Sequence, residues 1–347
     1  MSTTPKKSSS GNYIPSNVRE HEFVFTMSIL VICLLLIGCV SVPKSQVAVE
    51  TKPSHNYVYQ QVELVSLVMR LADYQEYNEE ITEYQQSLRT TFNQFSNHHA
   101  VEYARELRHT HEIGYDAPMH FAFHLQWVEN QFQFIDGVDL PQYDDRWTQE
   151  SAERLLELLN AFYIESNFVS FFQTNVPFYN ELSKRLEEEL LSRINYDWFL
   201  QYGFTKEQMR IAIHPAVSHN FYGTLLPNST VFAAIPATSR HFTLYYAPTI
   251  HEWAHGFANP IAEKWYEENE EFRLLCDSSV DFENLPYYAI GETMAREYVT
   301  RAYETLYFAE VLGLEVMPML LVEIEEGFPY IEKVYSMITE YEPVITD

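Results

Sequence analysis

The pentad His251-Glu252-Trp253-Ala254-His255 is the part of this sequence that most restricts how the chain can fold. A helix places residues four apart on one face, so a helical backbone here would let both imidazoles bind one zinc ion. Glu252 would then lie beside the metal. Zinc lowers the pKa of a bound water, and a carboxylate can take its proton during attack on a peptide carbonyl. The pattern therefore predicts a zinc site on a helix, with His251 and His255 as ligands and Glu252 as general base.

The residues around the pentad favour this interpretation. Short β-like runs precede it at 211–213, 230–235 and 241–246. Thr249 is a suitable helix N-cap, and Asn259-Pro260 predicts the end of the helix. A strand directly before the helix would let the edge of a small sheet bind an extended substrate. We therefore expect the small sheet to form one side of the site.

A third zinc ligand has to come from elsewhere, because catalytic zinc needs three protein ligands and an open position. Positions 258 and 261, where a third histidine could follow, hold Ala and Ile. The later stretch 291–302 offers Glu292 and Glu297. On a helical wheel Glu292 shares the more apolar face, whereas Glu297 shares a face with Thr300 and Glu304. The residues alone leave both glutamates open.

Two segments together resemble a known family. HEWAHGFANP at 251–260, followed by EYVTRA at 297–302, is similar to the DUF4932 family of exported bacterial gluzincin-type metallopeptidases. The resemblance covers about residues 210 to 310. It implies that Glu297 is the third zinc ligand and that Arg301 is its partner. An arginine four residues after a glutamate on a helix can hold and orient that carboxylate.

The rest of the chain predicts an α+β fold that is predominantly α-helical. We expect a helical N-terminal region at 57–205, and a zincin-like catalytic region at 206–347 with a small β-sheet before the HExxH helix. Hydrophobic residues make up 46% of the chain, which is enough for a sizeable core. The low count of 10 glycines argues against a Gly-rich phosphate-binding fold or a β-propeller.

The N-terminus has the features of an export signal. An uncharged run at 23–40 follows a polar leader with several basic residues. The run ends in Leu36-Ile37-Gly38-Cys39, which resembles a bacterial lipobox with Cys39 as the lipidated residue. We expect a leader at 1–38 and a tether at 39–56. The alternative is an uncleaved membrane anchor. Both place the remaining chain outside the cytoplasm and attached to a membrane.

Charge and cysteine content restrict the partners. The formal net charge of −27 disfavours nucleic acid and anionic membrane surfaces, which repel an acidic protein. The 3 cysteines are too few and too scattered for a disulfide framework. We expect a peptide or protein substrate. Two alternatives remain: a non-catalytic lipoprotein that binds zinc or substrate, and a helical scaffold with an incidental motif.

The sequence also offers candidates for stabilising the oxyanion of the reaction. They are chosen by closeness in the sequence, and packing is the ordinary role of each: Tyr287, Tyr288, Tyr298 and His241. Two further histidines flank the β-like region, where a structural role is the expected one: His214 and His219.

Overall fold

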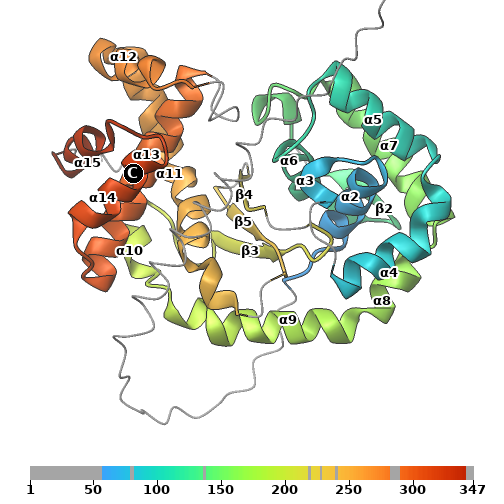
Figure 1. Ribbon diagram of the computed structural model, residues 1–347. Coiled ribbons are helices and arrows are strands. Elements are labelled where there is room, and N and C mark those ends of the chain that lie inside the picture. The colour runs from blue at the N-terminus through green and yellow to red at the C-terminus, as the bar shows by residue number, and fades with distance from the viewer. Residues whose placement is uncertain are drawn as a thin grey trace, which may run out of the picture.

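The chain folds mostly into helices, with two small sheets, as the predicted α+β class requires. Figure 1 shows the computed structural model, which describes residues 57–78, 82–135, 138–217, 220–226, 229–238, 241–281 and 290–340. The predicted leader, the tether and Cys39 lie outside the described residues. In the described part, no helix is both long enough and apolar enough to cross a bilayer.

The first half of the chain is helical, as expected. Its helices are α2 (Gln60–Leu71), α3 (Gln75–Asn78), α4 (Glu83–Phe92), α5 (His99–Thr110), α6 (Ala117–Phe123), α7 (Gln149–Glu165), α8 (Phe168–Thr174), α9 (Val176–Glu189) and α10 (Asp197–Leu200), with short 3-10 helices at Asn93–Phe95, Leu140–Gln142 and Leu191–Arg193. Thr82 and Thr148 cap α4 and α7, because their side chains accept hydrogen bonds from backbone N–H groups of the first turn. A hairpin of β1 (Leu125–Val128) and β2 (Gln131–Phe134) was not predicted.

Helix α2 forms the centre of this half. Every residue from Val62 to Leu71 is buried. Helices α5, α6 and α7 pack against it. A helix surrounded on all sides in this way is usually apolar throughout, yet α2 buries Glu63 and Arg70. Buried charges need partners. Both side chains have one in Ala216, whose N–H donates to Glu63 and whose carbonyl accepts from Arg70.

The second sheet lies between the two halves of the molecule (Figure 1). It contains β3 (Met209–Ile213), β4 (Tyr222–Leu225) and β5 (Val231–Ile235) in the order β3-β5-β4. Strand β5 runs parallel to β3 and antiparallel to β4. All of β5 is buried, whereas β4 forms an edge of the sheet. Helix α11 packs against β4 and β5.

The prediction of a strand at 241–246 is wrong. This segment forms a short 3-10 helix, Phe242–Tyr245, and then the start of α11. Phe242 and Tyr245 are three residues apart and both are buried, which a single helical turn permits. The edge strand is β4 instead, which the sequence did not predict.

The second half consists of five helices in the described part of the chain. They are α11 (Tyr246–Glu268), α12 (Glu270–Ser278), α13 (Gly291–Leu312), α14 (Val316–Glu325) and α15 (Ile331–Glu340). The predicted bounds of the HExxH helix are too narrow, since α11 starts before Thr249 and continues through Pro260. Pro260 removes one backbone hydrogen bond, to the carbonyl of Gly256. Packing against α13 along α11 outweighs this local cost.

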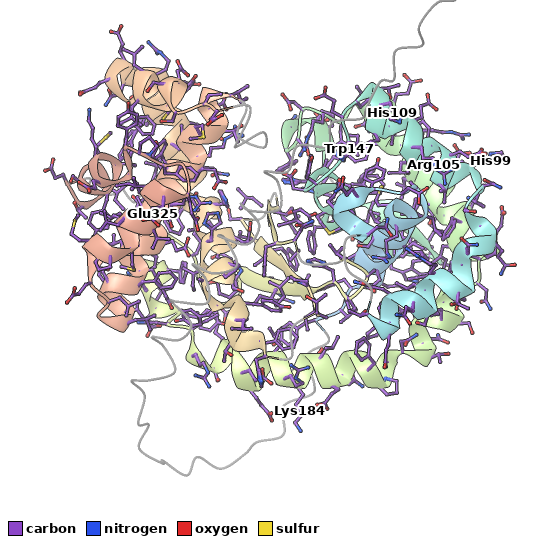
Figure 2. All side chains as sticks on the ribbon, viewed as in Figure 1. His99, Arg105, His109, Trp147, Lys184 and Glu325 are labelled. Atoms are coloured by element: carbon purple, nitrogen blue, oxygen red, sulfur yellow. The ribbon has the colours of Figure 1, made fainter. Side chains whose placement is uncertain are left out.

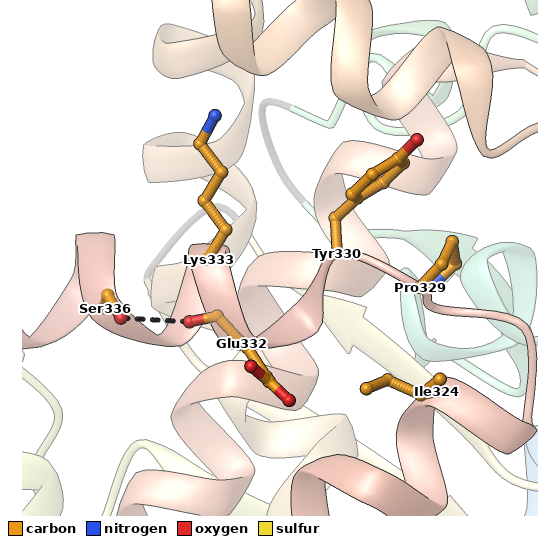
Figure 3. A pocket seen from close by; sticks show the side chains of 6 residues that line it. All are labelled: Ile324, Pro329, Tyr330, Glu332, Lys333 and Ser336. Carbon is orange, nitrogen blue, oxygen red and sulfur yellow. Dashed lines mark hydrogen bonds between the residues drawn. The ribbon is translucent and has the colours of Figure 1, made fainter.

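The outer surface carries features unrelated to the pentad. His99 and His109 lie on the outside of α5 (Figure 2). A shallow pocket between α14 and α15 is lined by Ile324, Pro329, Tyr330, Glu332, Lys333 and Ser336 (Figure 3). Its only hydrogen bond among the residues drawn joins Ser336 Oγ to the Glu332 carbonyl, at 3.0 Å.

Candidate metal centre

Two packed helices bring three potential ligands together. Helix α11 carries His251 and His255 on one face, and α13 carries Glu297 opposite them. The Nε2 atoms of the two histidines are 3.2 Å apart. Glu297 Oε2 lies 3.6 Å from His251 Nε2, and Glu297 Oε1 lies 3.5 Å from His255 Nε2. These are the only three residues in the described part of the chain that group in this way as possible metal ligands.

The spacing fits a small tetrahedral ion. Metal–ligand bonds of about 2.0–2.1 Å at tetrahedral angles place the ligand atoms about 3.3 Å apart. The two Nε2 atoms, 3.2 Å apart, are close to that value, and each lies 3.5–3.6 Å from one or other oxygen of the Glu297 carboxylate. With one ligand atom taken from each residue, all three lie within 4.8 Å of one another. In addition, Glu297 Oε2 is buried and makes no hydrogen bond, although Arg301 Nε lies 3.4 Å away as its ion-pair partner. A buried carboxylate oxygen without a hydrogen bond can still bind a metal ion. The residues present therefore fit a metal ion.

The protonation states also suit metal binding. Burial lowers the pKa of both His251 and His255, so both imidazoles are neutral near pH 7 and keep a lone pair. Burial opposes ionisation of Glu297, but the two histidines and Arg301 together hold its pKa below the ordinary value. The set consists of two neutral nitrogens and one carboxylate. Zinc accepts this combination of ligands.

The other nitrogen of each ligand histidine is also held. His251 Nδ1 lies 3.0 Å from Glu304 Oε2. Glu304 is on α13, about two helical turns after Glu297. His255 Nδ1 lies 2.9 Å from Asn259 Oδ1 and 3.0 Å from Thr300 Oγ1. With Nδ1 protonated, both rings turn Nε2 toward the centre. Tautomer and orientation are thus fixed from outside the ligand set.

Arg301 connects Glu297 to α14. Its Nε lies 3.4 Å from Glu297 Oε2, while its Nη1 lies 2.6 Å from Glu323 and 3.2 Å from Glu326. The guanidinium also covers the ring of Phe328, at 4.2 Å. Only 7% of the Arg301 side chain is exposed. A buried arginine that contacts three carboxylates has little freedom to move. Arg301 therefore restrains the carboxylate of Glu297.

Glu252 lies next to the ligands and against β4. A Cβ atom built on Gly223 of β4 would lie 2.8 Å from Glu252 Oε2 and 3.1 Å from the Glu252 carbonyl oxygen. Only glycine allows so close an approach. Burial raises the pKa of Glu252 well above its ordinary value, and the carboxylates of Glu297 and Asp116 act in the same direction. Asp116 belongs to the helical half, so both halves influence this carboxylate.

The structure separates the two glutamates that the sequence left open. Glu292 lies away from the histidines and pairs with Arg296 at 2.5 Å, with 44% of its side chain exposed. The helical-wheel argument for its burial is wrong: Ala295 and Val299 on the same face are buried, but Glu292 at the start of α13 is not. Glu304 and Thr300 were not predicted to contact the histidines. The sequence could have indicated these contacts, since Thr300 and Glu304 share a helical face with Glu297.

None of the described oxyanion candidates points to the centre. Tyr298 is buried and its hydroxyl lies 2.8 Å from Ser279 Oγ, so it serves packing. His241 is largely exposed near Glu189. His214 is fully buried beside Tyr222, as a structural histidine would be. Tyr287, Tyr288 and His219 lie outside the described residues.

Comparison of the chain with protein-family models, with curated proteins and with solved structures gave no match. The resemblance stated above therefore depends on the quoted residues alone. The geometry of the centre carries the functional argument.

Proposed function

We propose that this chain is a zinc-dependent metallopeptidase, with His251, His255 and Glu297 as zinc ligands. One observation carries the proposal: one ligand atom from each of the three residues lies within 4.8 Å of the others, and a fourth group, Glu252, follows His251 on the same helix. A structural zinc site would fill all four positions with protein ligands, whereas a catalytic site leaves one open. Three ligands and an adjacent carboxylate fit the catalytic kind.

The residues have separate tasks in this reaction. When bound, zinc would polarise the scissile carbonyl and lower the pKa of the attacking water. Glu252 accepts the proton from that water and passes it to the leaving amine. Burial makes Glu252 a stronger base than an exposed glutamate. Glu304 holds the Nδ1 proton of His251, and Arg301 holds Glu297 in place.

The substrate we propose is a peptide in extended conformation. Strand β4 is an edge strand, and its Gly223 lies directly against Glu252. A peptide that adds to this edge by main-chain hydrogen bonds would pass close to the general base. The zincin-like architecture of residues 206–347 and the membrane attachment through Cys39 belong to the same proposal. They are supported by the order sheet, HExxH helix, glutamate helix, and by the lipobox pattern.

The second candidate is a non-catalytic protein that binds zinc or a peptide. It would need the three ligands but not Glu252. The close fit between Glu252 and Gly223, where a side chain on the strand could enter only by displacing Glu252, favours the enzyme.

The deciding experiment compares Glu252→Gln with wild type, using a library of quenched fluorescent peptides. We expect the variant to bind one zinc ion per chain and to lose hydrolysis by about a hundredfold or more, because general-base catalysis contributes that much. Glu310→Gln is the matched control, since Glu310 lies on α13 but bonds Trp198 at 2.7 Å. Full activity of Glu252→Gln would refute the mechanism. Stoichiometric zinc in a wild-type protein that cleaves no peptide would favour the binding protein.

A further inference from the structure

A short buried turn connects β3 to the segment that leads into β4. It spans His214–Val217 and closes with a hydrogen bond from Val217 N to the His214 carbonyl, at 3.0 Å. Ala216 and Val217 are completely buried. Turns usually lie at the surface, because their backbone polar groups need water. A buried turn must find protein partners for those groups.

Side chains from the helical half supply these partners. Gln85 of α4 donates to the carbonyls of Pro215, at 3.2 Å, and Val217, at 2.9 Å. Glu63 of α2 accepts from Ala216 N at 3.2 Å, and Arg70 of α2 donates to the Ala216 carbonyl at 2.9 Å. These three side chains are buried. They satisfy four backbone groups of the turn, and we call them the turn clamp.

The same half also holds the start of β4. Asn220 donates to the carbonyl of Glu76, in α3, at 2.8 Å. The ring of Tyr222 stacks on Tyr77, also in α3, with 6.4 Å between the ring centroids. Tyr77 in turn is held by Arg70 of the clamp, which donates to its carbonyl. The turn is therefore held by α2 and α4, and Asn220 and Tyr222 are held by α3.

The strand that follows, β4, lies against Glu252. Gly223, the next residue after Tyr222, is the position at which an added Cβ would collide with the Glu252 carboxylate. A shift of β4 by a fraction of an ångström would change the space around that carboxylate. It would also move the edge to which we expect the substrate to add. The turn before β4 and the start of β4 thus contact residues that lie more than a hundred positions earlier in the chain, while β5 and α11 hold the strand itself.

We infer that the helical N-terminal half is a part of the active site: Glu63, Arg70 and Gln85 are positioning residues that hold β4 against Glu252. The inference rests on the proposed function for its catalytic consequence. Its structural content, that the clamp fixes β4, stands independently. The helical half then needs no substrate-binding role of its own to be required for activity.

The test replaces Gln85 by Met, which keeps the length of the side chain and removes both hydrogen bonds to the turn, together with the one that Gln85 accepts from Thr82 N at the start of α4. Asn160→Leu is the matched control. Asn160 also makes two hydrogen bonds to buried backbone, accepting from Phe132 N at 2.8 Å and donating to its carbonyl at 2.9 Å, but on the β1-β2 hairpin. We expect both variants to lose similar thermal stability and to keep one zinc ion per chain.

Only Gln85→Met should change β4. We expect amide hydrogen exchange at 222–225 to become about tenfold faster or more, and kcat/KM for the best library peptide to fall about tenfold, while Asn160→Leu leaves both at wild-type values. Asn220→Ala is a milder change, which removes the hydrogen bond from the segment before β4 to Glu76. It should act in the same direction, and it replaces Gln85→Met if that variant does not fold. Unchanged exchange at β4, or equal acceleration in Asn160→Leu, would overturn the inference. Exchange needs no substrate, so it decides the role of the clamp even if the wild type cleaves no peptide.

Discussion

Arginine 301 and arginine 296 form a natural comparison on one helix. Each contacts more than one glutamate, Arg301 with Glu297, Glu323 and Glu326, and Arg296 with Glu263 and Glu292. The exposed fraction of the side chain is 7% for Arg301 and 37% for Arg296. The substitution Arg→Met at each position removes the charge and keeps most of the apolar stem. We predict very different costs.

The difference follows from solvation. Removing Arg301 leaves three carboxylates in a buried site without their cation, and removal of one partner of a buried ion pair costs about 3–5 kcal/mol. Removing Arg296 leaves carboxylates that water can solvate, and exposed pairs contribute about 0–1 kcal/mol. With about 2.1 cal/mol/K of unfolding entropy per residue, each kcal/mol lowers the Tm of this 347-residue chain by about 1.5 °C. We expect a decrease in Tm of about 4 °C or more for Arg301→Met and under about 2 °C for Arg296→Met.

The assay is thermal and urea unfolding of both variants and wild type, prepared without metal, at pH 5 and pH 8. Burial raises the pKa of Glu323 to about 7, against the opposing effect of Arg301. Loss of Arg301 raises this pKa further, so at pH 5 the carboxyl is neutral and the missing cation matters less. The difference in unfolding free energy from wild type should therefore be smaller at pH 5. Equal destabilisation by the two variants, or no effect of pH on the difference, would refute the reasoning.

Three further predictions follow from other contacts. Glu304→Ala should weaken zinc binding about 10–100-fold, measured by competition with a chelator, because His251 loses the group that orients it. Gly223→Ala should reduce peptide hydrolysis about tenfold or more with little change in zinc content, since the new methyl group meets the Glu252 carboxylate. Burial raises the folded-state pKa of Glu63 to about 7, above its unfolded value of 4.5. The folded state therefore binds the proton more tightly, and stability decreases by about 3 kcal/mol as pH rises from 4.5 through 7. Glu63→Gln should remove that part of the pH dependence in urea unfolding, and an unchanged profile would contradict the assignment.

The arrangement of the pentad side chains could be predicted from the sequence, because it depends only on the local helix. Any helix through His251 and His255 places both imidazoles on one side, whatever the rest of the chain does. The apolar spacing of α2, α4, α7 and α9 is local in the same sense. These elements appear where the sequence predicted helices. The helix bounds were less predictable, since tertiary packing carries α11 through Pro260.

The edge strand was not predictable by such reasoning. Residues 222–225 read Tyr-Gly-Thr-Leu, a short run with a glycine in its interior, which ordinarily weakens a strand. Its neighbour β5 supplies the ladder on one side, and α3 holds its start. By contrast the run 241–246 has good β-propensity but forms a 3-10 helix and the start of α11. β-propensity alone therefore did not decide which of the two runs became a strand.

The third ligand shows where a local pattern helps and where it misleads. Glu292 looked buried because apolar residues share its face, but that face lies at the start of α13, where Arg296 is available four residues on. Glu297, Thr300 and Glu304 form one stripe along α13, and α11 packs on that stripe. A polar stripe on an otherwise buried helix needs partners, and here the partners are the two histidines. The polarity of the stripe was thus better evidence for the site than the apolarity of the face beside it.

The turn clamp extends the same argument to a longer range. A glutamate, an arginine and a glutamine inside a helical half would each be costly there. Their cost is offset because each finds a backbone group of residues 215–217, which are about 130–150 positions away in the sequence. Polar residues buried at such expense mark the contacts that the fold cannot make with apolar side chains. By our inference those contacts hold β4 beside Glu252, which would make the helical half and the proposed metal centre two parts of one site.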